Sequence, residues 1–420
     1  MITFLKKILN RSSTRELCSR VYLDNAGATE MSRSARSALL ASLSTYGNPS
    51  GIHREGVESG LLLDKARAKC ATALNAHSYE IFFVGSGTES CNLAIMGTYD
   101  AFATGNKLQA TTVGLPHIIV SSIEHPAVLE PVQQLEREGK IRVTYLPVYD
   151  DGIVKVHDIR EALTEDTILV SVMYANNEIG TIQPVKEIGR VIEEWKKAEG
   201  RTHTAYPYFH IDACQAANYC NLDVVRLRTH LMTVNSSKVY GPKGVALLYK
   251  REGISVSPTT LGGGQERGLR SGTESVPSAY AFAVALEDVQ KIKEEESVRL
   301  CELRDYCKNE LTKVIPNITF YGAWDDAKDI HRLSNNINCR IPGISSEEMI
   351  IRLDAKGVAV SHKSACASQV EDGSYVIKAL GATDTEANEN IRISLGRYTT
   401  KKDMDILVKE INNIVTGFSK

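Results

Sequence analysis

The chain has neither a C-x-x-C pair nor a cysteine set that suggests a disulfide framework, although nine of its 420 residues are cysteines. A chain of this length can bury a large core without disulfide staples, so the cysteines favour a reducing cytoplasm. No apolar run approaches the roughly 18 residues of a membrane-spanning helix. The 49 basic and 51 acidic residues leave a net charge of −2, and no whole-protein field would recruit nucleic acid. We therefore expect no membrane and no direct nucleic-acid partner, and no motif predicts a metal site.

The first 20 residues are more basic than the rest of the chain. Five basic residues oppose only Glu16, and the apolar residues between Met1 and Ile8 fall on one helical face. Such a segment is typical of an organelle transit peptide, which would place the protein in an organellar matrix, or of a loosely docked N-terminal extension. Lys6 and Lys7 cut the apolar stretch short, which excludes a secretory signal.

Short apolar runs alternate with amphipathic stretches between Val21 and Tyr249. The predicted strands are 81–84, 117–120, 141–145, 168–173, 208–211, 231–234 and 245–249. Strands separated by helices, such as the one predicted at 185–195, indicate an α/β fold with a mostly parallel seven-stranded sheet. A long charged helix follows from Ser278 to Val314, then a strand near 334–338 and a helix from Ser345. We expect a large domain at 32–290 and a smaller α+β domain formed by 1–31 and 291–420.

Lys238 and Asp212 point to one kind of chemistry. Lys238 lies in a polar loop after an apolar strand, and Asp212 follows another apolar strand directly. A lysine that forms a Schiff base and an acid that keeps a pyridine nitrogen protonated are what pyridoxal phosphate (PLP) requires. Gln215, three residues after Asp212, is placed to reach the ring hydroxyl. Each residue alone would be read as an ordinary surface group, but together they predict a PLP site.

The loops after three other strands carry residues suited to the same ligand, because ligands of such sheets bind beyond the carboxyl ends of the strands. The segment 85–90 is small and polar, so its backbone N–H groups and Thr88 can approach a phosphate at a helix N-terminus. His125 can stack on a cofactor ring and move protons. The amides of Asn176 and Asn177 can bond a ring hydroxyl or a substrate carboxylate.

In their order along the chain these motifs resemble the cysteine desulfurases of the NifS/IscS type, from about Val21 to Thr400. The matching stretches are 87–90, 124–125, 176–180, 212–215, 237–244 and 262–273. The family belongs to the class V aminotransferase group of fold-type I PLP enzymes. Its members are usually homodimers that take sulfur from L-cysteine, release alanine and pass the sulfur on as a persulfide. Sulfur acceptors such as an iron–sulfur scaffold or a tRNA-thiolation enzyme are the expected partners.

The resemblance implies a role for each cofactor residue. Lys238 is then the Schiff-base lysine, Asp212 and Gln215 contact the ring, and His125 stacks on it and shuttles protons. The residues implied around the phosphate are Gly87, Thr88, Asn235, Ser237 and, from the other subunit, Thr273. Asn177 serves cofactor and substrate. Ser237 stands where the family usually has histidine, and a serine still donates to a phosphate.

Cys366 is the predicted nucleophile. It lies in a stretch of small and polar residues, 360–369, which favours an accessible loop, and His362 and Lys363 close by would favour its thiolate. In the family this Ser-Ala-Cys position forms the persulfide. Cys70, Cys91, Cys301, Cys307 and Cys339 are expected to be small buried hydrophobes. Cys214 and Cys220, which flank Gln215, are the alternative sulfur carriers.

Arg392 begins the motif whose arginine grips the substrate carboxylate in the family, a role that suits a guanidinium fork. A surface salt bridge is the other use of such a residue.

Two functional alternatives remain beside cysteine desulfuration. One is a selenocysteine lyase with the same cofactor residues, and the other is a catalytically idle scaffold, which the presence of Lys238, Asp212 and Cys366 disfavours.

Overall fold

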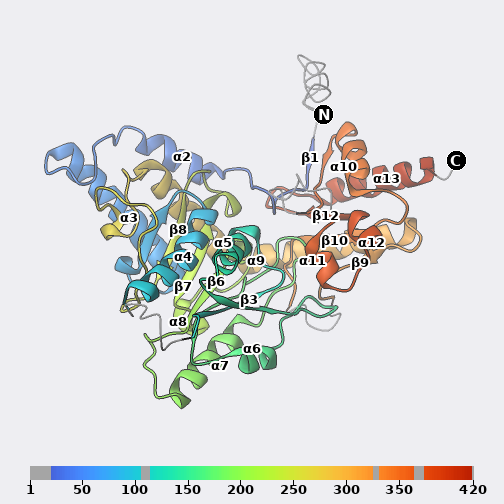
Figure 1. Ribbon diagram of the computed structural model, residues 1–420. Coiled ribbons are helices and arrows are strands. Elements are labelled where there is room, and N and C mark those ends of the chain that lie inside the picture. The colour runs from blue at the N-terminus through green and yellow to red at the C-terminus, as the bar shows by residue number, and fades with distance from the viewer. Residues whose placement is uncertain (1–19, 106–113, 325–330, 364–372, 419–420) are drawn as a thin grey trace.

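The computed structural model describes residues 20–105, 114–324, 331–363 and 373–418. The predicted alternatives for residues 1–20 therefore lie outside the described residues, apart from Arg20. A large α/β part, blue to green in Figure 1, lies beside a smaller orange and red part, and the long helix α9 (Val276–Val314) runs between them. Among the described residues, no helix is both long enough and apolar enough to cross a membrane.

The large part is built on one seven-stranded sheet of order β2-β8-β7-β6-β5-β3-β4. Its strands are β2 (Ile81–Val84), β3 (His117–Ser121), β4 (Arg142–Leu146), β5 (Thr167–Ser171), β6 (Tyr208–Asp212), β7 (Leu231–Asn235) and β8 (Ala246–Lys250). Every predicted strand is present within one or two residues. β8 alone runs antiparallel to both neighbours, β2 and β7, so the predicted mostly parallel sheet is confirmed.

Helices cover both faces of this sheet because successive strand residues point to opposite sides. Ile118 and Val120 pack in one core with α4 (Gly87–Gly105) and α5 (Pro126–Arg137), whereas Ile119 packs in the other. That second core includes residues of α3 (Arg54–Leu74), α6 (Val156–Ala162), α7 (Val185–Ala198) and the first half of α9. Two further helices are α2 (Arg33–Ser42), which packs on α9, and the short α8 (Val224–Leu227).

The smaller part has its own core around an antiparallel sheet of order β12-β10-β9. Its strands are β9 (Thr319–Phe320), β10 (Asn336–Arg340) and β12 (Asn390–Ser394), and its helices are α10 (Ser346–Ala355) and α13 (Lys401–Phe418). The N-terminal strand β1 (Val21–Tyr22) joins it by pairing in parallel with β11 (Val358–Ala359). β1 therefore lies beside a strand that follows it by 337 residues in the sequence, and it joins the orange and red part of Figure 1.

The domain boundary near residue 290 stays a prediction, which the packing of α9 supports. Its residues up to Val289 belong to the core of the large part, and those from Leu300 onward belong to the core of the small part. One short segment crosses over: Val376 and Ile377 of α11 (Tyr375–Ala379), with Ala387 of α12 (Asp384–Asn388), pack into the large core.

Candidate active site

A pocket of about 160 Å³ opens where the parallel strands β3, β5, β6 and β7 end. Most of the predicted site residues line it: Gly87, Thr88, His125, Asn177, Asp212, Gln215, Asn235, Lys238 and Arg392. They come from five separate segments of the large part and from β12 of the small part. The pocket therefore lies between the two parts of the chain, with the polar groups of both converging on it.

Lys238 follows β7 in a single 3-10 turn and is half-buried. Its Nζ donates to the carbonyl oxygens of Ala26 at 2.8 Å and Gly27 at 2.5 Å. Gln215 Nε2 donates to the same Ala26 oxygen at 2.9 Å. These carbonyls hold the amine at the wall of the pocket, and the segment that supplies them was given no role from the sequence.

Asp212 ends β6 and is 8% exposed. One carboxylate oxygen accepts the backbone N–H of Cys214 at 3.0 Å, and the Cys91 thiol lies 3.8 Å from the other. Removing a carboxylate from water is costly unless a positive or donating group faces it. The pocket offers a place for such a group, and the protonated nitrogen of a pyridine ring fits this requirement.

His125 is the N-cap of α5, and its Nδ1 accepts the N–H of Ala127 at 3.1 Å. This bond assigns the ring proton of the neutral imidazole to Nε2. Burial lowers the pKa of His125, and the positive charges of Lys238 and Arg392 lower it further, while Asp212 acts in the opposite direction. The imidazole is therefore neutral at pH 7, which allows it to give or take a proton within the pocket.

The predicted phosphate cradle lies at the start of α4. A Cβ on Gly87 would lie 3.2 Å from Cys214 Sγ and 3.3 Å from Asn235, so the glycine permits a close approach there. The backbone N–H of Gly85 is less available to a phosphate than predicted, because it donates to the Glu89 carboxylate at 2.6 Å. Ser237 does not line the pocket; its N–H donates to Asn235 Oδ1.

Thr273 does not line this pocket either. It is exposed and borders a second hollow with Arg270 and Gly85. Within one chain it therefore borders a different hollow from the one that the predicted cofactor residues line.

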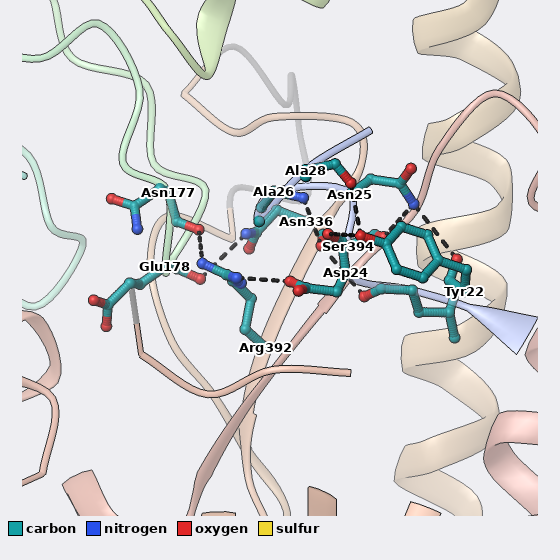
Figure 2. A network of polar contacts seen from close by, with 12 residues as sticks. Tyr22, Asp24, Asn25, Ala26, Ala28, Asn177, Glu178, Asn336, Arg392 and Ser394 are labelled. Carbon is teal, nitrogen blue, oxygen red and sulfur yellow. Dashed lines mark hydrogen bonds and ion pairs between the residues drawn. The ribbon is translucent and has the colours of Figure 1, made fainter. Parts of the chain in front are cut away.

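Arg392 lines the pocket from β12 and is 1% exposed. Its Nη2 pairs with Asp24 at 2.8 Å, and its Nη1 donates to the carbonyl oxygen of Asn177 at 3.2 Å (Figure 2). Sequence reasoning assigned no role to Asp24. The criterion used for Asp212, an acid directly after an apolar strand, would have found it after Val21–Leu23.

Glu124 is a second residue that sequence reasoning left without a role. It is fully buried, accepts the backbone N–H of Met173 at 2.7 Å and the Ser121 hydroxyl, and its other oxygen has no partner among the described residues. Burial raises the pKa of Glu124 to about 8, against the effect of these two hydrogen bonds. Glu124 is therefore mostly protonated at pH 7 and does not add a full negative charge. Its hydrogen bonds to Ser121 and Met173 connect the end of β3 with the segment that follows β5.

Cys366 lies outside the described residues, but the residues on both sides of its segment are near the pocket. Ser361 pairs with Arg392 through two backbone hydrogen bonds. On the other side, Ser374 donates to the Glu178 carboxylate and Tyr375 to the carbonyl oxygen of Glu124. Burial lowers the pKa of His362, and the charge of Lys363 lowers it further, which favours the neutral form of the imidazole.

Cys214 and Cys220, the alternative sulfur carriers, are poor nucleophiles. Burial raises the pKa of Cys214 well above its usual value and that of Cys220 to about 12, which disfavours both as sulfur carriers. Four of the five predicted structural cysteines are buried: Cys70, Cys91, Cys307 and Cys339. Cys301 is only partly buried, so the prediction for it was wrong.

Comparison with known proteins shows the family to which the chain belongs. The model of the aminotransferase class V family matches residues 21–407. The chain belongs to this family, in the branch of the IscS-type cysteine desulfurases. The cysteine desulfurase IscS of Dictyoglomus turgidum is 39% identical over 94% of both chains. A solved NifS-like protein superimposes with a TM-score of 0.83 at 32% identity, covering 95% of this chain and all of that one.

A second solved structure, SspA in complex with cysteine, is 29% identical, with a TM-score of 0.72 over 90% of this chain and all of that one. The class V family and the resemblance drawn from the motifs therefore agree. The fold also agrees, since the seven-stranded sheet is the one expected of these enzymes.

Proposed function

We propose that the chain is a PLP-dependent cysteine desulfurase that releases L-alanine from L-cysteine and keeps the sulfur as a Cys366 persulfide for an acceptor. One observation carries the proposal: a single pocket brings together Lys238, Asp212 and His125 with Arg392 of the smaller part. The relatives named IscS and the SspA complex with cysteine support the choice of substrate. Incubation of the purified protein with L-cysteine and a reductant tests it, with alanine and sulfide in equal amounts as the expected products.

The residues of the pocket fit PLP. Lys238 would hold its aldehyde carbon, Asp212 its pyridine nitrogen, Gln215 its ring hydroxyl, and the α4 N-terminus with Gly87 and Thr88 its phosphate. His125 lies at the same pocket with a neutral ring. When bound, the cofactor supplies an electron sink that stabilises negative charge at the substrate's α-carbon.

The chain's own groups divide the remaining tasks. Arg392 binds the α-carboxylate with Asn177 beside it, Lys238 takes the α-proton, and His125 manages the proton of the substrate thiol. The Cys366 thiolate then attacks the substrate sulfur: one S–S bond forms, the C–S bond breaks, and the carbon becomes the methyl group of alanine. No external oxidant is needed, because the carbon keeps the electron pair of the C–S bond and gains a proton, while the Cys366 sulfur and the transferred sulfur are oxidised to the persulfide.

Asp212→Asn lowers kcat for L-cysteine by about 10²–10³-fold, since a neutral amide cannot keep the pyridine nitrogen protonated. The side chain keeps its size and its contact with the Cys214 N–H, so the melting temperature and cofactor content stay close to those of the wild type. Steady-state kinetics on protein of measured cofactor content check this. A kcat within threefold of the wild type would remove Asp212 from the site.

We further propose a two-fold homodimer in which Thr273 reaches the phosphate of the partner's cofactor. The exposed position of Thr273 outside the pocket of its own chain supports this. Sedimentation is expected to give twice the mass of one chain, and Thr273→Ala is expected to weaken retention of PLP during dialysis. Ser271→Ala, a change to a neighbour in the same loop, is the control. An active monomer at assay concentration would contradict the assembly.

The acceptor of the sulfur is proposed by class only: an iron–sulfur scaffold or a tRNA-thiolation enzyme. A reducing compartment, the cytoplasm or an organellar matrix, suits an enzyme that depends on a free thiolate, and all seven cysteines in the described part of the chain are free thiols.

Selenocysteine lyase stays as a second candidate, because it shares the pocket residues; turnover of selenocysteine without turnover of L-cysteine would favour it. An idle scaffold is disfavoured by Lys238, Asp212 and His125 in one pocket and by the presence of Cys366 in the sequence.

A further inference from the structure

The turn between β1 and Thr29 touches both halves of the active site. Its geometry is set by Asp24, whose carbonyl oxygen accepts the N–H groups of Gly27 at 3.0 Å and Ala28 at 3.2 Å. Toward the small part, Asn25 Nδ2 and the Ala26 N–H donate to Ser394, each at 2.9 Å (Figure 2). Toward the large part, the carbonyl oxygens of Ala26 and Gly27 hold Lys238 Nζ. The turn thus contacts the strand that carries Arg392 and the amine of Lys238.

The charge of Arg392 requires a partner, since its side chain is 1% exposed and a buried unpaired guanidinium is costly. Asp24 supplies the negative charge through one oxygen, at 2.8 Å from Nη2, and remains 25% exposed itself. The carbonyl oxygen of Asn177 takes Nη1, and Nε has no partner among the described residues. Two directed contacts therefore fix the plane of the guanidinium. Its remaining N–H groups stay available as hydrogen-bond donors.

We propose that Asp24 is a positioning residue for the reaction: it holds the guanidinium of Arg392 in the orientation that receives the substrate's α-carboxylate. The inference rests on the proposed function, in which Arg392 binds that carboxylate. Asp24 could instead act as an internal carboxylate that competes with the substrate for Arg392. In that role Asp24 would have to move away from Arg392 when the substrate binds. The turn opposes such a movement, because Asp24 Oδ2 lies where a Cβ on Gly27 would approach it to 2.5 Å, so the carboxylate is packed against the turn backbone.

Three variants of the full-length holoenzyme test this role: Asp24→Ala, Asp24→Asn and, as a control, Glu30→Gln. Glu30 carries the same charge in the next part of the segment, but its side chain is 68% exposed and 4.0 Å from its nearest cation. KM and kcat are measured with L-cysteine. Inhibition constants are measured for L-alanine and for ethylamine, which is alanine without its carboxylate.

Asp24→Ala is expected to raise KM and the inhibition constant of L-alanine about tenfold or more, which is typical for loss of a hydrogen bond to a charged group. The kcat value changes less, and the ethylamine constant stays the same. Asp24→Asn restores both carboxylate-dependent constants to within about threefold of the wild type, because its amide oxygen still accepts from Nη2. Glu30→Gln leaves all constants unchanged.

An unchanged or lower L-alanine constant in Asp24→Ala would overturn the proposal. If that variant does not fold, Gly27→Ala replaces it, since the added Cβ displaces the Asp24 carboxylate; the ratio of the L-alanine to the ethylamine constant must then rise, and an unchanged ratio overturns the proposal. Failure of the proposed function is separate, because it would show as absent turnover of L-cysteine by the wild-type protein.

Discussion

Lys238→Ala abolishes the turnover of L-cysteine and the visible absorption of bound PLP. In the proposed mechanism the amine links to the cofactor and removes the α-proton, and positioned proton transfer alone contributes about 10²–10⁴-fold to a rate. The loss in kcat is therefore expected to exceed about 10³-fold. Absorption spectra after dialysis and single-turnover assays with L-cysteine measure the two effects.

Lys238→Arg is the matched control for charge. A guanidinium keeps a positive donor near the Ala26 and Gly27 carbonyls, which hold the lysine amine at 2.8 and 2.5 Å, but it stays protonated and cannot link to an aldehyde. The arginine variant is therefore expected to be as inactive as the alanine variant. Full activity in either one would remove the PLP assignment.

Cys366→Ser separates the sulfur step from the steps before it. The variant still binds L-cysteine, because Lys238, Asp212 and Arg392 are untouched, but release of sulfide falls by roughly two orders of magnitude or more, since a hydroxyl does not replace a thiolate at sulfur. Spectral changes on addition of L-cysteine report the early steps, and sulfide formed with a reductant reports the last one.

Cys214→Ser and Cys301→Ser are the controls for this experiment. Cys214 lines the pocket, and desolvation raises the pKa of its thiol; Cys301 lies in α9, and both cysteines are partly buried. Both variants are expected to keep near-normal sulfide release. If Cys366→Ser keeps it as well, the reaction needs no protein thiol and the selenocysteine lyase becomes the better assignment.

Most of the sheet could be predicted from the sequence because six of its strands are almost entirely buried and read as short apolar runs, whereas the edge strand β4 is partly exposed. Ile118 and Ile119 illustrate this: they are neighbours in β3 and pack in different cores, so both faces of the strand are covered. The direction of β8 could not be predicted, since its apolar run has the same pattern whether it pairs in parallel or antiparallel. No local sequence pattern indicates that residues between 376 and 387 pack into the core of the large part.

In the site, residues at strand ends were predictable and their long-range partners were not. Lys238 and Asp212 each follow an apolar run, which places them at the same edge of the sheet. The Asp24–Arg392 pair joins residues 368 positions apart, and nothing near either one indicates the other. The lowered pKa of His362 likewise depends on burial that only the folded chain provides.

Single turnover with L-cysteine in the absence of reductant tests the central claim most directly. One equivalent of L-cysteine per active site is expected to give one equivalent of L-alanine, and one added sulfur atom on the peptide that carries Cys366, measured by mass spectrometry. The other cysteine peptides should remain unchanged. Alanine formed together with free sulfide and no added sulfur on Cys366, or no alanine at all, would contradict the account.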